Sequence, residues 1–125
     1  MAEAEMTNTG PTEPPGQLSV VSTTVNGIRV VTLAGEIDHH TGDTLRQALD
    51  ASHTPRPRVV VDLHQVTFMD SSGINIFIAA HHTLSEADGW LRLAAPGESV
   101  MRTLNIVGVD TLIDCRETLR QALGN

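Results

Sequence analysis

Residues 58–84 read RVVVDLHQVTFMDSSGINIFIAAHHTL, and the periodicity of their apolar residues changes halfway along. The opening RVVVDL is a β-branched run bounded by proline and by a polar segment, which predicts a strand buried on both faces. From Asp70 onward the apolar residues recur at helical spacing. The predicted inner stripe of this helix consists of Ile74, Phe77, Ile78, His81 and Leu84. The stretch therefore predicts a buried strand that runs directly into a helix.

Strands and helices alternate on both sides of this unit. Before it, Asn26-Gly27 joins two predicted strands and favours a tight hairpin turn between them, and a loop and a helix follow up to residue 49. After it, the pattern predicts a strand at residues 90–93, a helix at 98–107, a strand at 111–113 and a final helix at 116–123.

The order of these elements, ββαβαβαβα, predicts the class of fold. Such alternation needs a mostly parallel sheet with crossover helices, and the opening hairpin adds an antiparallel pair. We therefore expect an α/β fold, a mixed sheet of about five strands with helices packed on it, spanning residues 18–123. Residues 1–17 are rich in proline, contain three glutamates and lack an apolar period, so we expect them to form a disordered acidic tail.

The composition limits what the chain can bind. All eight basic residues are arginines, aromatic residues make up 2%, and the formal net charge is −7, which together argue against a nucleic-acid partner. The single Cys115 excludes an internal disulfide and favours a reducing compartment. No segment approaches the roughly 18 apolar residues of a membrane span, and the first ten residues lack the pattern of a secretory signal. We therefore expect a cytoplasmic protein without membrane association.

No catalytic constellation stands out. A serine nucleophile on a strand-to-helix elbow needs glycine two residues before and two after it, and neither Ser71 nor Ser72 has that pattern. The chain has no lysine and no phosphate-binding glycine motif. The histidines that could bind a metal stand as adjacent pairs, His39-His40 and His81-His82. Neighbouring residues of a helix point in different directions, so we expect no metal and no cofactor, and a binding module rather than an enzyme.

Phe68-Met69-Asp70-Ser71-Ser72-Gly73 is the most unusual local segment, and it has two interpretations. The first is a helix cap, in which Asp or Ser accepts hydrogen bonds from unpaired backbone N–H groups, worth roughly 1 kcal/mol. The second is a regulatory site, because three consecutive polar residues exceed what one cap requires and a serine at the tip of a domain is open to a kinase. The residues alone leave both interpretations open.

Two segments of the sequence resemble a known family. GEIDHHTGDTLRQAL at residues 35–49 and VVVDLHQVTFMDSSGINIF at residues 59–77 are similar to the STAS domain of bacterial anti-sigma factor antagonists, and the resemblance covers nearly the whole folded part. It implies a cytosolic switch protein that binds an anti-sigma factor which is also a serine kinase. Binding would release a sigma factor for transcription, phosphorylation of one serine would block binding, and a protein phosphatase would restore it.

The resemblance assigns roles to particular positions. The family's phosphoacceptor falls on Ser71, and its loop aspartate near the phosphoacceptor falls on Asp38. The resemblance implies that Asp38 and Asp70 orient the Ser71 hydroxyl and form part of the partner surface. We expect that surface to consist of Asp38, Asp70, Ser71, Ser72, Gly73 and Asn75. Family members commonly carry glycine where this chain has Asn75, and the added bulk could change which kinase is accepted.

A phosphate on Ser71 would add a charge of about −1.5 to −2 beside acidic neighbours, and no arginine stands next to it in the sequence. We therefore expect phosphorylation to block the surface without refolding the domain. Two alternatives remain within the family: a STAS-domain scaffold of a stress-signalling complex, and a soluble STAS subunit of a transporter. The free-standing domain and the intact Asp-Ser-Ser-Gly motif favour the antagonist.

Overall fold

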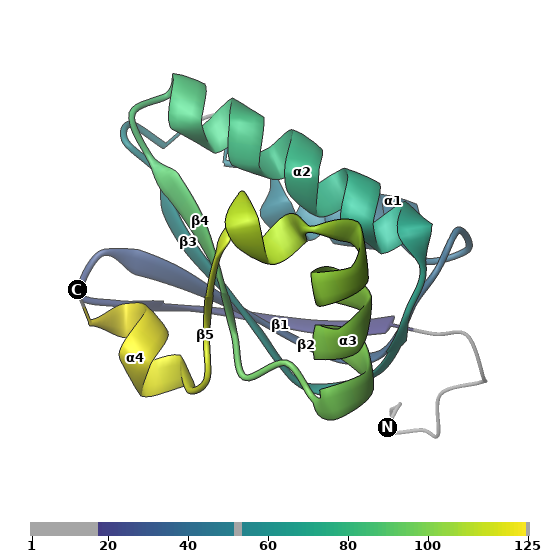
Figure 1. Cartoon of the computed structure of the whole chain (residues 1–125). Coiled ribbons are helices and arrows are strands. Elements are labelled where there is room, and N and C mark those ends of the chain that lie inside the picture. Colours follow the sequence, from purple (N-terminus) through teal and green to yellow (C-terminus); the bar gives the residue numbers. More distant parts are fainter. Residues whose placement is uncertain (1–17, 52–53, 125) are drawn as a thin grey trace, which may run out of the picture.

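A five-stranded sheet forms the centre of the fold, and helices cover both of its faces (Figure 1). The computed structural model describes residues 18–51 and 54–124. The elements are β1 (Leu18–Val25), β2 (Ile28–Ile37), α1 (Gly42–Leu49), β3 (Arg58–Met69), α2 (Ser71–Glu86), β4 (Trp90–Ala94), α3 (Glu98–Val107), the 3-10 helix η1 (Val109–Thr111), β5 (Asp114–Arg116) and α4 (Leu119–Leu123). The predicted α/β class and the mixed five-stranded sheet are confirmed.

The strands lie side by side in the order in which they occur along the chain. β1 and β2 are antiparallel, and the Asn26-Gly27 turn between them has φ angles of 52° and 80°, as a two-residue hairpin loop requires. The pairs β2–β3, β3–β4 and β4–β5 are parallel, each joined through a helical crossover. The opening hairpin is therefore the sheet's antiparallel part, as the sequence predicts.

The core is divided between the two faces of the sheet. On one face, α1, α2 and α3 cover the larger cluster, in which Phe77, Leu45 and Leu104 are fully buried. On the other face, Ala122 of α4 packs with Val60 and Ala94 in a smaller cluster. β3 contributes to both clusters, which confirms the prediction that its first half is buried on both faces.

The predicted strand at residues 111–113 is wrong. After Gly108 ends α3 in a left-handed conformation, the chain turns through η1, and the Ile113 amide donates to the Val109 carbonyl at 2.8 Å. Ile113 is buried and its neighbour Leu112 is exposed, and these apolar residues precede the strand instead of forming it. The strand forms three residues later, as β5, and the final helix begins at Leu119 rather than at residue 116.

The predicted tail, residues 1–17, lies outside the described residues. Within the described part of the chain, no helix is long and apolar enough to span a membrane.

Candidate functional site

The site predicted around Ser71 lies where β2 and β3 end side by side. Ile37 and Met69, the last residues of these parallel strands, are register partners, so Asp38 and Asp70 follow adjacent strands about 5 Å apart at the backbone. The Asp70 amide donates to the Ile37 carbonyl at 3.1 Å, which ties the two strand ends together. Residues about thirty positions apart in the sequence are thereby brought to one edge of the sheet.

Asp70 caps α2 and so fixes the orientation of Ser71. Its backbone is extended, and its Oδ1 accepts a hydrogen bond from the Ser72 amide at 2.8 Å. Ser71 is the first residue of the helix and is exposed, whereas Ser72 is half-buried. The capping interpretation is therefore correct for Asp70, and it leaves the Ser71 side chain at the surface, where an enzyme can reach it.

Asp38 organises the loop between β2 and α1. Its Oδ1 accepts hydrogen bonds from the amides of His40 at 2.9 Å and Thr41 at 3.2 Å. In return, the Asp38 amide donates to Thr41 Oγ1 at 2.9 Å, and this hydroxyl lies 3.1 Å from the Glu36 carbonyl, to which it donates. Because Thr41 is buried, these bonds hold the loop rigidly beside the start of α2.

Neither carboxylate is bonded to the Ser71 hydroxyl. The hydrogen bonds of Asp38 and Asp70 go to backbone amides, and among the described residues neither has an arginine or histidine partner. The implied role of orienting the hydroxyl is therefore not supported by a hydrogen bond: Asp70 caps the helix that begins at Ser71, and Asp38 organises its own loop. They also bring two acidic residues, without a basic side chain bonded to them in the described part of the chain, to the strand ends next to it.

Gly73 is required by close packing between α2 and the ends of the two strands. A Cβ atom at this position would lie 2.5 Å from Cγ2 of Ile37 and 2.9 Å from Cγ of Met69. Both of these side chains are buried in the main core. Gly73 itself is buried, so it supports the surface around Ser71 from below and offers little contact area to a partner.

Two exposed side chains extend the surface around Ser71. Asn75, one helical turn further along α2, is exposed, as a partner-facing residue must be. Phe68 has 47% of its surface exposed at the end of β3, two residues before Asp70, and the sequence-based prediction does not include it in the partner surface although it opens the unusual segment. The sequence feature that could have indicated Phe68 is the rarity of aromatic residues, since the chain has only two phenylalanines.

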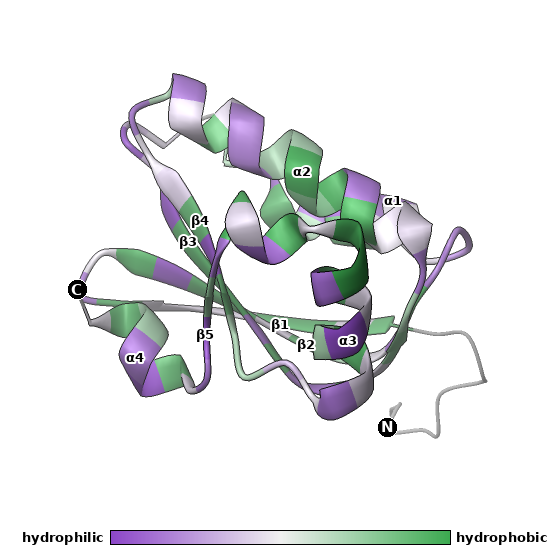
Figure 2. Ribbon diagram, in the orientation of Figure 1, coloured by the Kyte–Doolittle hydropathy of each residue, from purple (hydrophilic) through white to green (hydrophobic). Residues whose placement is uncertain are grey.

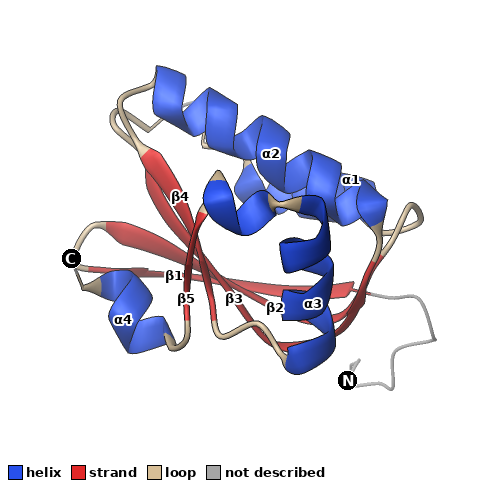
Figure 3. Cartoon of the chain, in the orientation of Figure 1, coloured by secondary structure: helices blue, strands red, loops and turns tan. Residues whose placement is uncertain are grey.

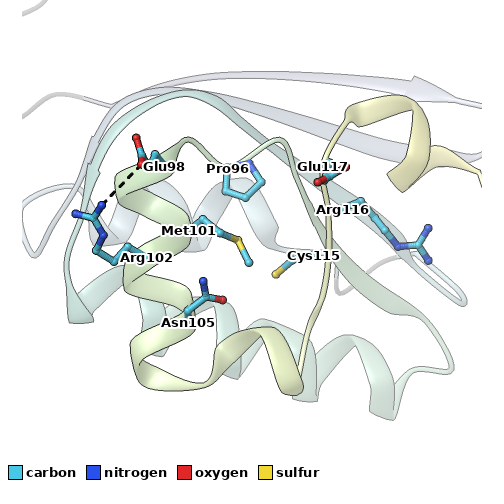
Figure 4. Close-up of a pocket in the computed structure, with 8 residues that line it drawn as sticks. All are labelled: Pro96, Glu98, Met101, Arg102, Asn105, Cys115, Arg116 and Glu117. Atoms are coloured by element: carbon cyan, nitrogen blue, oxygen red, sulfur yellow. Dashed lines mark ion pairs between the residues drawn. The ribbon is translucent and has the colours of Figure 1, made fainter.

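A pocket lies away from Ser71, between α3 and β5. It has a volume of about 570 Å³, and Figure 4 shows Met101 and Cys115 pointing toward one another across it. Glu98 and Arg102 form an ion pair at its rim, with 3.9 Å between oxygen and nitrogen. Burial, assisted by the nearby Asp110 and Asp114, raises the pKa of the Cys115 thiol to about 11, so the thiol is a poor nucleophile at neutral pH.

His64 and Asp62 form a pair of ionisable groups on β3. His64 Nδ1 is 2.8 Å from Oδ1 of Asp62, whose side chain is buried. Among the described residues, no third histidine, cysteine or acid joins them, nor any other cluster of three possible metal ligands. The pair is an isolated structural contact.

Comparison with known proteins gives a consistent result. The family model described as the STAS domain matches residues 19–122. An anti-sigma F factor antagonist of Paenibacillus polymyxa is 31% identical over 85 residues, which cover 66% of this chain and 73% of that protein.

Solved structures match as well. The crystal structure of an anti-sigma factor antagonist from Mycobacterium paratuberculosis aligns with a TM-score of 0.80 and 30% identity, covering 90% of this chain and 96% of that one. The Bacillus cell fate determinant SpoIIAA in its phosphorylated form aligns with a TM-score of 0.62 and 21% identity, covering 84% of this chain and 96% of that one. The second likeness concerns the fold alone.

Proposed function

Because this chain belongs to the STAS domain family, we propose that it is an anti-sigma factor antagonist: its unphosphorylated form binds an anti-sigma factor and thereby releases a sigma factor for transcription. The observation that carries this proposal is the exposed Ser71 at the first position of α2, next to the adjacent strand ends that Asp38 and Asp70 follow. Relatives of about 30% identity, in several bacteria, bear the same functional name.

The proposed partner surface is the one formed by the two strand ends and the first turn of α2. Its polar residues are Asp38, Asp70, Ser71, Ser72 and Asn75. Gly73 lets the first turn of α2 pack closely on the ends of the two strands. The exposed Phe68 adds an apolar contact at its border. A rigid, preformed surface suits this role because binding then costs little ordering entropy.

Phosphorylation of Ser71 is proposed as the switch, made by an anti-sigma factor with serine kinase activity and reversed by a protein phosphatase. A phosphate at the first position of a helix is favoured by the helix dipole, by roughly 0.3 to 1 kcal/mol, so the domain stays folded. The partner instead meets new negative charge. At about 6 Å and an effective dielectric constant near 20, one unit of like charge costs roughly 2.8 kcal/mol, about a hundredfold in affinity.

The same proposal makes the protein a cytoplasmic regulator and not an enzyme, with no cofactor of its own. Its serine is the substrate of another protein's chemistry, and within the described residues neither the Asp38 nor the Asp70 carboxylate is hydrogen-bonded to the Ser71 hydroxyl as a general base would be. A serine nucleophile would need such a base within hydrogen-bond reach.

The test uses the purified chain and candidate anti-sigma factor kinases from the same organism. With ATP, we expect one phosphate on the wild type, located at Ser71 by mass spectrometry, and none on Ser71→Ala. Ser71→Ala should bind the kinase as the wild type does, and Ser71→Asp at least about tenfold more weakly. Ser99→Asp is the matched control, because Ser99 is also exposed in the first turn of a helix, α3, and should bind normally. Phosphate on Ser72 instead, or equal binding by Ser71→Asp and the wild type, would contradict the switch.

A further inference from the structure

The two edges of the sheet are built differently (Figure 3). β5 is three residues long and carries the charged Asp114 and Arg116. The Ala95 amide donates to the Arg116 carbonyl at 2.9 Å, so by strand alternation Cys115 alone directs its backbone groups outward. The amide after the strand, that of Glu117, donates to Oε1 of Gln121 at 3.1 Å. This edge is short, charged and closed, as is usual for strands protected against pairing.

β1, the opposite edge, has none of these protections. It is eight residues long, reads LSVVSTTV, and contains no charged residue and no proline. Its pairing with β2 is continuous, without a bulge that would twist the edge away. The last five residues, Val21 to Val25, are all exposed. A long, neutral, β-branched edge strand is a template for pairing with another strand.

The hairpin fixes which backbone groups of β1 point outward. In a two-residue hairpin the flanking residues, here Val25 and Ile28, exchange both backbone hydrogen bonds, and hydrogen-bonded pairs then alternate along the ladder. Thr23 and Val21 therefore bond to β2. Val20, Ser22 and Thr24 direct their N–H and C=O groups away from the sheet.

We propose that β1 is a dimerisation edge, at which a second copy of this chain pairs antiparallel and joins the two sheets into one. The two-fold axis passes through Ser22, so Ser22 faces Ser22 of the partner subunit and Val20 faces Thr24 of the partner subunit. These three outward-facing positions give about six backbone hydrogen bonds. Antiparallel pairing about a two-fold axis makes the contact self-complementary, so it closes at two copies.

Exposed apolar surface favours a second copy as the occupant, and the absence of charged residues on β1 permits this pairing although each chain is acidic. The chain carries a net charge of −7, and the uncharged β1 is a place where two such chains can meet without facing like charges. On the face away from α1, Val21 is 58% exposed and Val25 is 38% exposed. In the proposed register Val21 packs beside Thr23 of the partner subunit, a favourable cross-strand pair.

The dimer leaves the proposed regulatory site open. Ser71 lies at the ends of β2 and β3, whereas the seam runs along the side of β1 that faces away from β2. The inference rests on the edge strand alone, and it holds whether or not Ser71 is the switch.

The test is the mass of the full-length chain in solution, measured by sedimentation equilibrium from micromolar to millimolar concentration. We expect a dimer for the wild type. Ser22→Lys should raise its dissociation constant by about a hundredfold, because the two lysines face each other across the axis. Ser85→Lys, with the same charge at an exposed position of α2, should dimerise as the wild type does. A wild type that is monomeric at millimolar concentration, or an unaffected Ser22→Lys dimer, would overturn the proposal.

The register is tested by crosslinking in a Cys115→Ala background. Ser22→Cys should form a disulfide-linked dimer under mild oxidation, because each new thiol lies opposite its copy. Thr23→Cys is the matched control, since its neighbour across the seam is Val21 of the partner subunit. Equal crosslinking of the two variants would refute the two-fold pairing about Ser22, and circular dichroism checks that both are folded.

Discussion

Replacing Gly73 by alanine should destabilise the domain, although alanine is the better helix former. The new Cβ would lie 2.5 Å from Cγ2 of Ile37 and 2.9 Å from Cγ of Met69, so these contacts must open by roughly 1 Å to reach ordinary separation. Ile37 is 0% and Met69 is 4% exposed, so neither side chain can move into solvent. Overpacking of this kind costs about 1 to 3 kcal/mol, and the gain in helix propensity offsets at most about 1 kcal/mol.

We therefore expect Gly73→Ala to lose about 1 to 2 kcal/mol of unfolding free energy, measured by urea titration, and about 3 to 8 °C in Tm. Gly42→Ala is the control. Gly42 is also buried in the first turn of a helix, α1, but its Cβ would meet the flexible end of Ile76, Cδ1, at 3.3 Å. This variant should be as stable as the wild type or slightly more so. Wild-type stability of Gly73→Ala, or equal losses in the two variants, would refute the reasoning.

Other predictions concern the helix cap and the thiol. Asp70→Ala removes the acceptor for the Ser72 amide and should cost about 1 kcal/mol in denaturant titration, while Asp70→Asn should restore most of it. Because burial raises the pKa of the Cys115 thiol to about 11, its alkylation by iodoacetamide at pH 8 should be far slower in the folded protein than in urea. Above pH 9.0, the ordinary pKa of a cysteine thiol, the unfolded chain releases this proton first, so stability should fall between about pH 9 and 11 for the wild type, and less for Cys115→Ala.

The sequence predicts the central strand and helix well because their burial follows simple periods. It misses Ile76, which is 5% exposed, because α2 packs on both α1 and the sheet and so buries more than one stripe. It misplaces the strand near residue 112 because the chain turns at the left-handed Gly108, and the apolar residues that follow lie in the 3-10 helix η1 and its turn rather than in a strand. A local sequence pattern cannot show that a helix packs against two different elements, or where the chain turns after a helix.

The site divides in the same way. The cap at Asp70 can be read from the sequence, since an acid before a helix is a local signal. The need for glycine at position 73 cannot, because the clashing Ile37 belongs to a strand about thirty-five residues earlier. The exposed apolar side chains Ile106 and Val107 also escape prediction, because they fit the pattern of a buried helix end. Figure 2 shows the C-terminal end of α3 in green, the colour of hydrophobic residues.

The agreement between strand order and chain order has a consequence for folding during synthesis. Each strand pairs with the one made immediately before it, so the sheet can grow from one end as the chain leaves the ribosome. The residues proposed to bind the anti-sigma factor all lie between positions 38 and 75, at the ends of β2 and β3 and in the segments that follow these strands. We expect this part to assemble while β4, α3 and β5 are still being translated. A chain stalled after α2 should therefore already contain β2, β3 and the first turn of α2 in their final arrangement.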